Sequence, residues 1–477
     1  MGEGAHTGDE LQLRIPALQI HAPMNEIAFD PADTKAALAQ LPRTAAVFSL
    51  YGADERAEPY IGRTPNLRGR LERLLQPSLK HPKRLQLAER VRRIAWQLTG
   101  SEFESLLKQF ALLEDRFGAK ALERMHLRAP AFVRYLGSNE YPRVVVTHRP
   151  SQREADWAFG PFQSRAAAER YVDEALKLFL LRRCTDDLNP DPRFPGCVYS
   201  EMKMCLAPCY KGCTDERYTE ESAAVESFFA TRGESRLVTL RAQREQAAAD
   251  LEFETAAAIH AQVQKVEAVR ALAAELVRPL SRLRAVILQP AANPGEVAVF
   301  LFELGSMRGP AAFSTVGMRI QNEQSGSTSL FAQPMAVEPV VSDQWSVVIG
   351  PGPGVRDQGS EGQGIGNREQ GIEMQGSEIQ GLETRDPGTK AGLKAHRTML
   401  ELRLDEVLVA LGAPRPAPSA TARQGHVALL KRWYYRPEAK RTGEIFFPDG
   451  EDRWPIRSIL RGIGRVAAKS LTGSSDS

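Results

Sequence analysis

All five cysteines of this 477-residue chain fall within one short segment. They are Cys184, Cys197, Cys205, Cys209 and Cys213. The number is odd, and the first residues lack the basic and apolar stretches of a secretion signal, so a disulfide framework explains the pattern poorly. Four thiolates gathered in a reducing compartment can hold a zinc ion or a 4Fe–4S cluster. The segment therefore predicts a metal centre, although its spacing differs from the paired cysteines of a zinc ribbon.

The rest of the chain has the composition of an ordinary globular protein. It carries 62 Lys and Arg residues against 59 Asp and Glu residues, a formal net charge of +3, which excludes a uniformly basic or uniformly acidic protein. No stretch approaches the roughly 18 consecutive apolar residues of a membrane-spanning helix. We therefore expect a cytoplasmic protein without a membrane partner, and its length suggests about three domains of roughly 150 residues each.

The sequence patterns predict an α+β multidomain chain. The expected parts are a flexible tail (1–27), a small α/β domain (28–130), an intermediate domain with the cysteines (131–215), a helical region (220–277), a β-rich unit (280–349), a linker (350–393) and a mostly helical C-terminal unit (394–477). The linker is predicted because residues 351–390 contain ten glycines. Such a segment cannot bury enough apolar surface to offset the entropy lost on ordering.

The pattern of residues 28–130 predicts a β-hairpin followed by helices. Residues 44–51 and 58–62 are typical of two short strands. Residues 66–96 have helical spacing, and residues 101–118 place their apolar side chains on one face of a helix. These apolar side chains are Phe103, Leu106, Leu107, Phe110 and Leu113.

The end of this hairpin carries residues suited to cutting a phosphodiester bond. Tyr60 would orient or deprotonate a water molecule, while Arg63 and Arg70 would neutralise the phosphate in the transition state. The alternative is a plain hairpin packed on a surface helix whose arginines are solvated.

The helical segment that follows is strongly basic. Between Arg63 and Arg93 there are ten Lys and Arg residues against two acidic residues. This ratio favours the backbone of duplex DNA as a partner, although a charge run also suits a solvated helix face. The residues expected to contact DNA are Arg63, Asn66, Arg68, Arg73, Lys80, Lys83 and Arg84.

The order of these residues resembles the GIY-YIG nuclease domain that begins proteins of the UvrC family, the incision subunit of bacterial nucleotide excision repair. That family follows a G-[VI]-Y strand with the pattern Y-[VI]-G-K-A-x-N-L-[KR]-x-R. Residues 60–70 are YIGRTPNLRGR and match at the YIG triplet, Asn66, Leu67 and Arg70. The resemblance implies a DNA endonuclease that uses Mg²⁺ or Mn²⁺, with Tyr60, Arg63 and Arg70 in its site.

Two positions depart from the family pattern. Phe48 stands where the first triplet of the family has a tyrosine, and Gln109 stands where the family has a metal-binding glutamate. A neutral amide is a weaker ligand for Mg²⁺ than a carboxylate. Glu102 lies on the same helical face as Gln109, but about 10 Å along the axis. If the site cuts DNA, Gln109 or a nearby acid has to help hold the metal.

The cysteine segment also resembles UvrC. The sequence PGCVYSEMKMCLAPCYKGC is similar to the segment that follows the nuclease domain, where UvrC proteins carry a 4Fe–4S cluster. Carried over by motif, the ligands are Cys184, Cys197, Cys205 and Cys209, and Cys213 is spare. Zinc remains an alternative.

A third segment predicts a helical hairpin. Residues 235–269 have two helical halves that meet near Leu251, and the sequence DLEFETAAAIHAQV resembles the UVR motif through which UvrC contacts UvrB. The resemblance implies a UvrB-type partner bound through Leu251, Phe253 and Ile259. The alternative is a plain pair of surface helices.

The resemblance runs from about residue 40 to about residue 275 and keeps the three modules in the UvrC order. We therefore expect a UvrC-like repair protein with a partly degenerate nuclease site. Two alternatives remain: a non-catalytic adaptor that binds DNA and UvrB, and an iron–sulfur redox sensor on DNA. After residue 350 we find no counterpart of the RNase H-like domain of UvrC. Residues 462–468 suit either a helix end or a hairpin that grips a DNA backbone.

Overall fold

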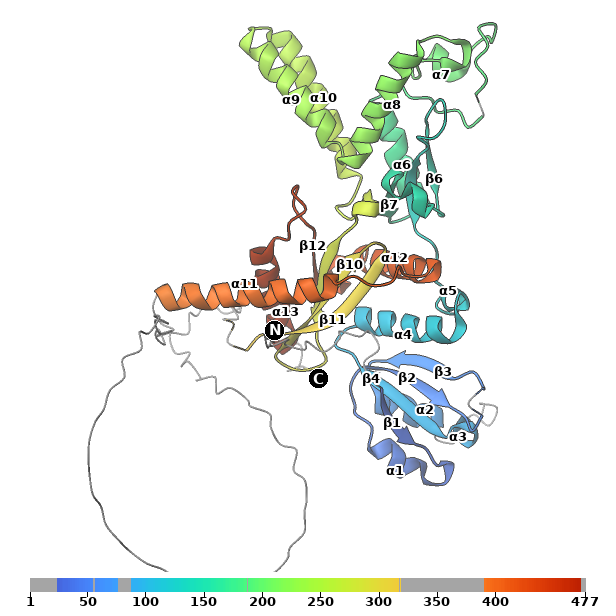
Figure 1. Cartoon of the computed structure of the whole chain (residues 1–477), viewed down its shortest axis with the longest axis vertical. Helices are drawn as coiled ribbons and strands as arrows, with labels where there is room; N and C mark the ends of the chain where they lie inside the picture. Colours follow the sequence, from blue (N-terminus) through green and yellow to red (C-terminus); the bar gives the residue numbers. More distant parts are fainter. Residues whose placement is uncertain are drawn as a thin grey trace, which may run out of the picture. The chain divides into compact units, whose positions relative to one another are not determined.

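The computed structural model describes residues 24–54, 56–75, 87–186, 188–316, 318 and 390–472 (Figure 1). The chain divides into two compact units, one of residues 1–322 and 401–477 and the other of residues 323–400. The expected linker lies almost entirely outside the described residues, as do residues 319–349 of the expected β-rich unit.

The described strands form three sheets of four strands each, and their pairings are antiparallel. The strands are β1 (Asn25–Ala28), β2 (Ala46–Tyr51), β3 (Tyr60–Thr64), β4 (Arg93–Leu98), β5 (Ala131–Tyr135), β6 (Val144–Thr147), β7 (Ala158–Phe162), β8 (Arg278–Pro279), β9 (Ala285–Pro290), β10 (Glu296–Glu303), β11 (Ser306–Ser314) and β12 (Glu444–Phe446). The chain is thus a mixed α/β multidomain protein, as the sequence predicts.

The helices lie between and around these sheets. The α-helices are α1 (Thr34–Ala39), α2 (Leu67–Leu75), α3 (Leu87–Arg90), α4 (Glu102–Phe117), α5 (Lys120–Arg124), α6 (Arg165–Leu176), α7 (Val198–Glu201), α8 (Asp215–Ala230), α9 (Glu234–Ala249), α10 (Phe253–Ala271), α11 (Lys390–Gly412), α12 (Ala420–Tyr434) and α13 (Ile456–Thr472). Short 3-10 helices are η1 (Pro31–Asp33), η2 (Gln152–Trp157), η3 (Pro208–Tyr210), η4 (Leu280–Arg282) and η5 (Glu438–Lys440). Among the described helices, none has the length and apolar character needed to cross a membrane.

The first sheet has the strand order β1-β4-β2-β3. The helix expected at residues 66–96 is wrong at residues 93–96, which belong to β4. Hydrogen bonds from β1 on one side and β2 on the other satisfy this strand, and they outweigh its local helical spacing. Because β1 begins at Asn25, the sheet takes in residues that the sequence analysis assigned to the flexible tail.

Helix α4 has two chemically different sides. Its polar side meets the strand end that precedes it: Lys108 Nζ donates to the Leu98 carbonyl, and Glu104 accepts from the Gly100 amide. Lys108 and Glu104 also form a buried ion pair with a 2.7 Å N–O distance. The apolar side, predicted from the sequence, packs instead on the third sheet, where the Phe103 ring lies 5.6 Å from that of Phe300. One helix therefore covers parts of two domains.

The middle sheet has the order β6-β5-β7-β8, and helices α6 and α8 pack on it. An aromatic cluster fills its core, in which the Phe159 and Tyr171 rings lie 5.5 Å and 5.7 Å from the Phe229 ring. Helices α9 and α10 run side by side as a hairpin between α8 and β8 (Figure 1). The chain then returns to the middle sheet, because β8 pairs with β7.

The third sheet has the order β11-β10-β9-β12. Strand β12 belongs to the expected C-terminal helical unit, yet it pairs with β9, so the segments on both sides of the undescribed stretch share one sheet. Residues 285–288 of β9 are fully buried in succession, which requires cover on both faces. Helices α12 and α4 cover one face, and α13 packs against β9 and β10. Residues 462–468 lie inside α13, so the hairpin alternative for them is wrong.

We expect Gly425→Ala to destabilise the protein, because a Cβ on Gly425 of α12 would lie 2.0 Å from the Phe110 ring of α4. The expected loss in the free energy of unfolding is about 1–3 kcal/mol, measured by urea denaturation. Gly464→Ala in α13 is the matched control, since a methyl group added there has open space within 4 Å and alanine favours a helix by roughly 0.5–1 kcal/mol. Equal losses in the two variants would contradict this packing of α12 on α4.

Candidate functional site

The residues of the predicted phosphodiester site lie on two faces of the first sheet. Tyr60 starts β3 and is 41% exposed, and its ring lies 6.0 Å from the buried ring of Phe48 on β2. Phe48 stands opposite Gly62, where a Cβ would lie 2.8 Å from its ring, so glycine is required there. The ring beside Tyr60 is therefore that of a phenylalanine, which carries no hydroxyl group.

Arg63 points away from Tyr60, because residues three apart on a strand face opposite sides. It contacts α4, where its Nη2 lies 3.3 Å from Oε1 of Glu102. Gln109 lies farther along the same helix and is partly buried. Arg70 lies on α2 and is partly buried, and its guanidinium makes no hydrogen bond or ion pair with any described residue.

Four of the predicted DNA contacts bond within the protein: Arg63 pairs with Glu102, Arg73 Nε donates to the Gly69 carbonyl, and Asn66 and Arg68 also have partners. Asn66 Oδ1 accepts from the Gly69 amide at 2.9 Å and so caps the start of α2. The Arg68 guanidinium donates to the carbonyls of Leu41 and Ala39, both at 2.6 Å, which ties α2 to α1. Arg73 is exposed on α2. Lys80, Lys83 and Arg84 lie outside the described residues.

Glu102 links Arg63 to Arg436, a residue far away in the sequence. Arg436, which follows α12, donates from Nη1 and Nη2 to both Glu102 carboxylate oxygens at 2.7 and 3.0 Å. The hydrogen bond from Arg436 holds the pKa of the Glu102 carboxyl below its ordinary value, and Arg63 adds to the effect. The carboxylate is thus engaged by two arginines.

The five cysteines are free thiols and partly buried. Burial, with a smaller effect from the neighbouring Cys184, Cys209 and Cys197, raises the pKa of the Cys205 thiol to about 11. Cys209 also acts on Cys213, which packs against the core of the middle domain. In the part of the chain that the structure describes, no group of three or more His, Cys, Asp or Glu side chains is arranged to hold a metal ion.

The donor chemistry of this segment nevertheless suits a soft metal centre. The thiol Sγ of Cys205 accepts from the Ala207 amide at 3.3 Å, a contact that stabilises a thiolate. The backbone amides of Cys209 and Tyr210 lower the pKa of the Cys209 thiol. Burial outweighs them, so that this pKa stays above its ordinary value. Arg182 is 3% exposed, and its guanidinium donates to the backbone carbonyls of Cys184 and Asp186, so a buried positive charge lies next to the backbone at Cys184.

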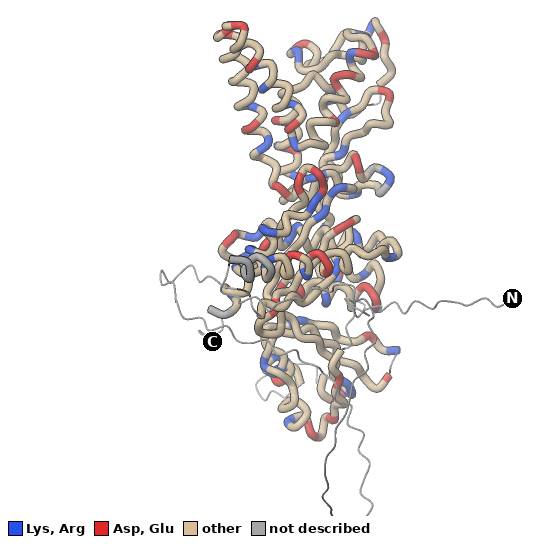
Figure 2. The backbone as a smooth tube through the Cα atoms, turned by 60° about the vertical axis from the view of Figure 1, so that its left-hand side comes forward, with Lys and Arg blue, Asp and Glu red and all other residues tan. Residues whose placement is uncertain are grey.

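The helical hairpin turns where the sequence predicts. Leu251 lies in the turn between α9 and α10 and is 71% exposed, and Phe253 at the start of α10 is 68% exposed. Ile259, the third predicted partner contact, packs inward against the core instead. Basic and acidic residues are both present along the pair (Figure 2), and two ion pairs, Arg241–Glu267 and Arg270–Glu234, join one helix to the other.

Comparison with known proteins identifies the middle of the chain. Residues 132–228 match the family described as the UvrC/Cho excinuclease middle domain, and residues 234–269 match the UvrB/uvrC motif. The two matches follow each other in the order that the sequence analysis expects. The chain is UvrC-like in this part.

Curated relatives match about half of the chain. The UvrABC system protein C of Alcanivorax borkumensis is 29% identical over 242 residues, which are 51% of this chain and 39% of that protein. The protein of the same name from Idiomarina loihiensis is 30% identical over 48% of this chain and 37% of its own length. The chain thus matches less than two fifths of these relatives. No solved structure matches it.

Sequence reasoning missed the link from Glu102 to Arg436. The two residues are 334 positions apart, and no local pattern pairs an acid with an arginine at such a distance. It also missed the buried Lys108–Glu104 pair, whose four-residue spacing on a helix was the one available signal.

Glu102→Gln is expected to lower the free energy of unfolding by about 0.5–1 kcal/mol near neutral pH, since the pair is partly exposed. The folded-state pKa of Glu102 is lowered from 4.5, so its contribution is complete above that value and is lost as the pH falls through the lowered pKa. Urea denaturation at about pH 7 and about pH 3 measures the difference from the unmodified protein. Glu123→Gln, on an exposed position of α5, is the control. A difference that persists unchanged in acid would contradict the ion pair.

Proposed function

We propose that this chain is a DNA-repair protein of the UvrC type, which acts in nucleotide excision repair by binding duplex DNA and a UvrB-type partner. One observation carries the proposal: the cysteine-bearing middle domain is followed directly by the UVR-type hairpin in the same unit. The relatives named UvrABC system protein C support it over about half of the chain.

The hairpin is the proposed partner surface. Leu251 and Phe253 expose most of their apolar side chains at its tip, which costs hydration free energy in the isolated chain. A second helical hairpin placed against this tip would bury both residues in a four-helix contact. The inward-facing residues, such as Val263 and Val266, are already buried and would keep the hairpin rigid.

Phe253→Ser combined with Leu251→Ser is expected to weaken binding to a UvrB-type protein about ten- to a hundredfold, because loss of the two apolar contacts together costs roughly 1.4–2.8 kcal/mol. Isothermal titration calorimetry with purified UvrB measures the effect. Leu304→Ser is the matched control, since Leu304 is an equally exposed leucine in the turn after β10. Unchanged affinity in the double variant would remove the hairpin tip from the interface.

The cysteines are proposed to hold a 4Fe–4S cluster through Cys184, Cys197, Cys205 and Cys209, with Zn²⁺ as the alternative occupant. Support comes from the influence of Cys184, Cys197 and Cys209 on the Cys205 thiol and from the Ala207 amide that donates to its sulfur. Such a centre would brace the loops around α7, a helix without buried residues. Iron and zinc analysis of the purified protein distinguishes the two occupants.

The first domain is proposed to have a GIY-YIG-type fold with an endonuclease site. Tyr60 would orient or deprotonate the attacking water, and Arg70 would stabilise charge on the phosphate. Arg70 suits this role because no described side chain pairs with its guanidinium. A bound Mg²⁺ or Mn²⁺ would supply further charge neutralisation and a more acidic water, and Gln109 is the neutral residue that would face it.

A non-catalytic adaptor is the second candidate. It is favoured by Phe48, which brings no hydroxyl to Tyr60, by Gln109, and by the engagement of Glu102 with Arg63 and Arg436. Such a protein would bind DNA and UvrB and would deliver or restrain another nuclease.

Nicking of a lesion-containing duplex separates the two candidates. With UvrB, and with Mg²⁺ or Mn²⁺, a working nuclease should nick the duplex, and Tyr60→Phe and Arg70→Ala should each lower the rate at least about a hundredfold. Cleavage that survives both substitutions would remove this site from the reaction. Absence of cleavage with DNA binding intact, and gain of cleavage in Gln109→Glu, would establish the adaptor.

A further inference from the structure

Helix α13 has an exposed side made almost entirely of basic residues. The exposed residues among those whose side chains are described are Arg457, Arg461, Arg465, Lys469 and Ser470. The four basic residues, here called the basic stripe, recur every four positions, which places them in a slanting row along one side of a helix. The opposite side is apolar, and Ile459, Ile463 and Val466 are buried there. The row extends about 18 Å along the helix axis.

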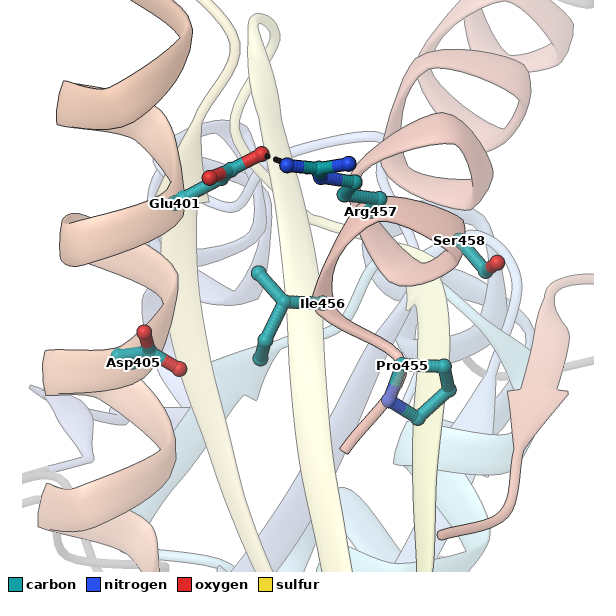
Figure 3. Close-up of a pocket in the computed structure, with 6 residues that line it drawn as sticks. All are labelled: Glu401, Asp405, Pro455, Ile456, Arg457 and Ser458. Atoms are coloured by element: carbon teal, nitrogen blue, oxygen red, sulfur yellow. Dashed lines mark hydrogen bonds and ion pairs between the residues drawn. The ribbon is translucent and has the colours of Figure 1, made fainter. Parts of the chain in front are cut away.

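The stripe is only partly neutralised by its neighbours. Arg457 pairs with Glu401 of α11 across a surface cleft (Figure 3), and Arg465 pairs with both oxygens of Glu444 on β12. Arg461 contacts the Arg457 carbonyl and the Ser458 hydroxyl, which are neutral groups. Arg457 is 71% exposed, so its ion pair is weak and can be exchanged for a phosphate.

The burial of the apolar side of α13 favours a phosphate backbone over a lipid surface as the partner of the stripe. An amphipathic basic helix binds a lipid surface by inserting its apolar side. That side of α13 is occupied by the sheet, because Ile459 and Ile463 are completely buried. The stripe offers charge without an apolar insertion surface, which suits a regular row of phosphates. Over about 18 Å, one strand of a duplex presents about five phosphates at roughly 3.4 Å each along the axis.

We propose that the basic stripe of α13 docks the phosphate backbone of duplex DNA, as a surface distinct from the basic helix α2. The inference rests on the proposed function, which supplies DNA as the polyanion. It assigns a role to the C-terminal segment, which lies beyond the family matches at residues 132–228 and 234–269. The contact is sequence-blind, since phosphates carry no base identity.

The test is binding of a fluorescent duplex by the full chain, measured by anisotropy over a salt series. Arg457→Gln with Arg461→Gln should raise the Kd about ten- to a hundredfold at low salt and reduce the slope of log K against log salt by about 2. The matched control is Arg165→Gln with Lys177→Gln on α6, which removes the same charge from exposed residues that also form ion pairs within their helix. The control should stay within about twofold, and thermal denaturation verifies that both variants are folded.

The outcomes separate this inference from the proposed function. Unchanged affinity in the α13 variant, or an equal loss in the control, overturns the stripe as a DNA surface. If Arg70→Gln with Arg73→Gln on α2 loses affinity while the α13 variant does not, the proposed function stands and this inference fails. No duplex binding by the unmodified protein overturns both. Retained DNA binding with lost binding of polyglutamate would assign the stripe to an acidic protein instead.

Discussion

Helix α4 is the element on which the arrangement of the first compact unit depends. Its polar side is bound to the end of β4 through Lys108 and Glu104, and its apolar side fills the core of the third sheet through Phe103 and Phe110. The buried ion pair is stable because both charges have further hydrogen bonds to the backbone. Loss of the polar contacts would detach the helix from the first sheet, and loss of the apolar contacts would uncover a face of the third sheet.

This shared helix brings the C-terminal segment to the candidate nuclease domain. Arg436 reaches Glu102 at the start of α4, and Glu102 holds Arg63 on the adjacent strand. The cation predicted to meet a phosphate is therefore positioned by a residue far away in sequence. The Tyr60 side of the sheet has no such link, because it faces α1 and α2. The two halves of the predicted site thus have different supports within one small sheet.

Much of the architecture is predictable where a pattern is local. The hairpin turn at Leu251, the strands β2 and β3, and the apolar stripe of α4 follow from side-chain periodicity and turn residues. Strand β4 was not predictable in this way, since its helical spacing is outweighed by hydrogen bonds from β1 and β2. For the candidate site, the sequence predicts Tyr60, Arg63, Arg70 and Gln109. It did not foresee that Asn66 and Arg68 are bound to the backbone of their own domain, because those carbonyl and amide partners depend on the fold.

The sequence by itself determined the identity and order of two modules. The middle domain and the UVR-type hairpin are each encoded by one continuous stretch of residues, so their patterns can be recognised without the fold. It also determined the clustering of the cysteines. Only the tertiary structure decided which surfaces these modules share. The pairing of β12 with β9, the packing of α4 on the third sheet and the reach of Arg436 to Glu102 join residues more than a hundred positions apart. Such contacts form through burial and hydrogen bonding between distant segments. Local periodicity shows which side of a strand or helix is buried, but not which segment packs against it.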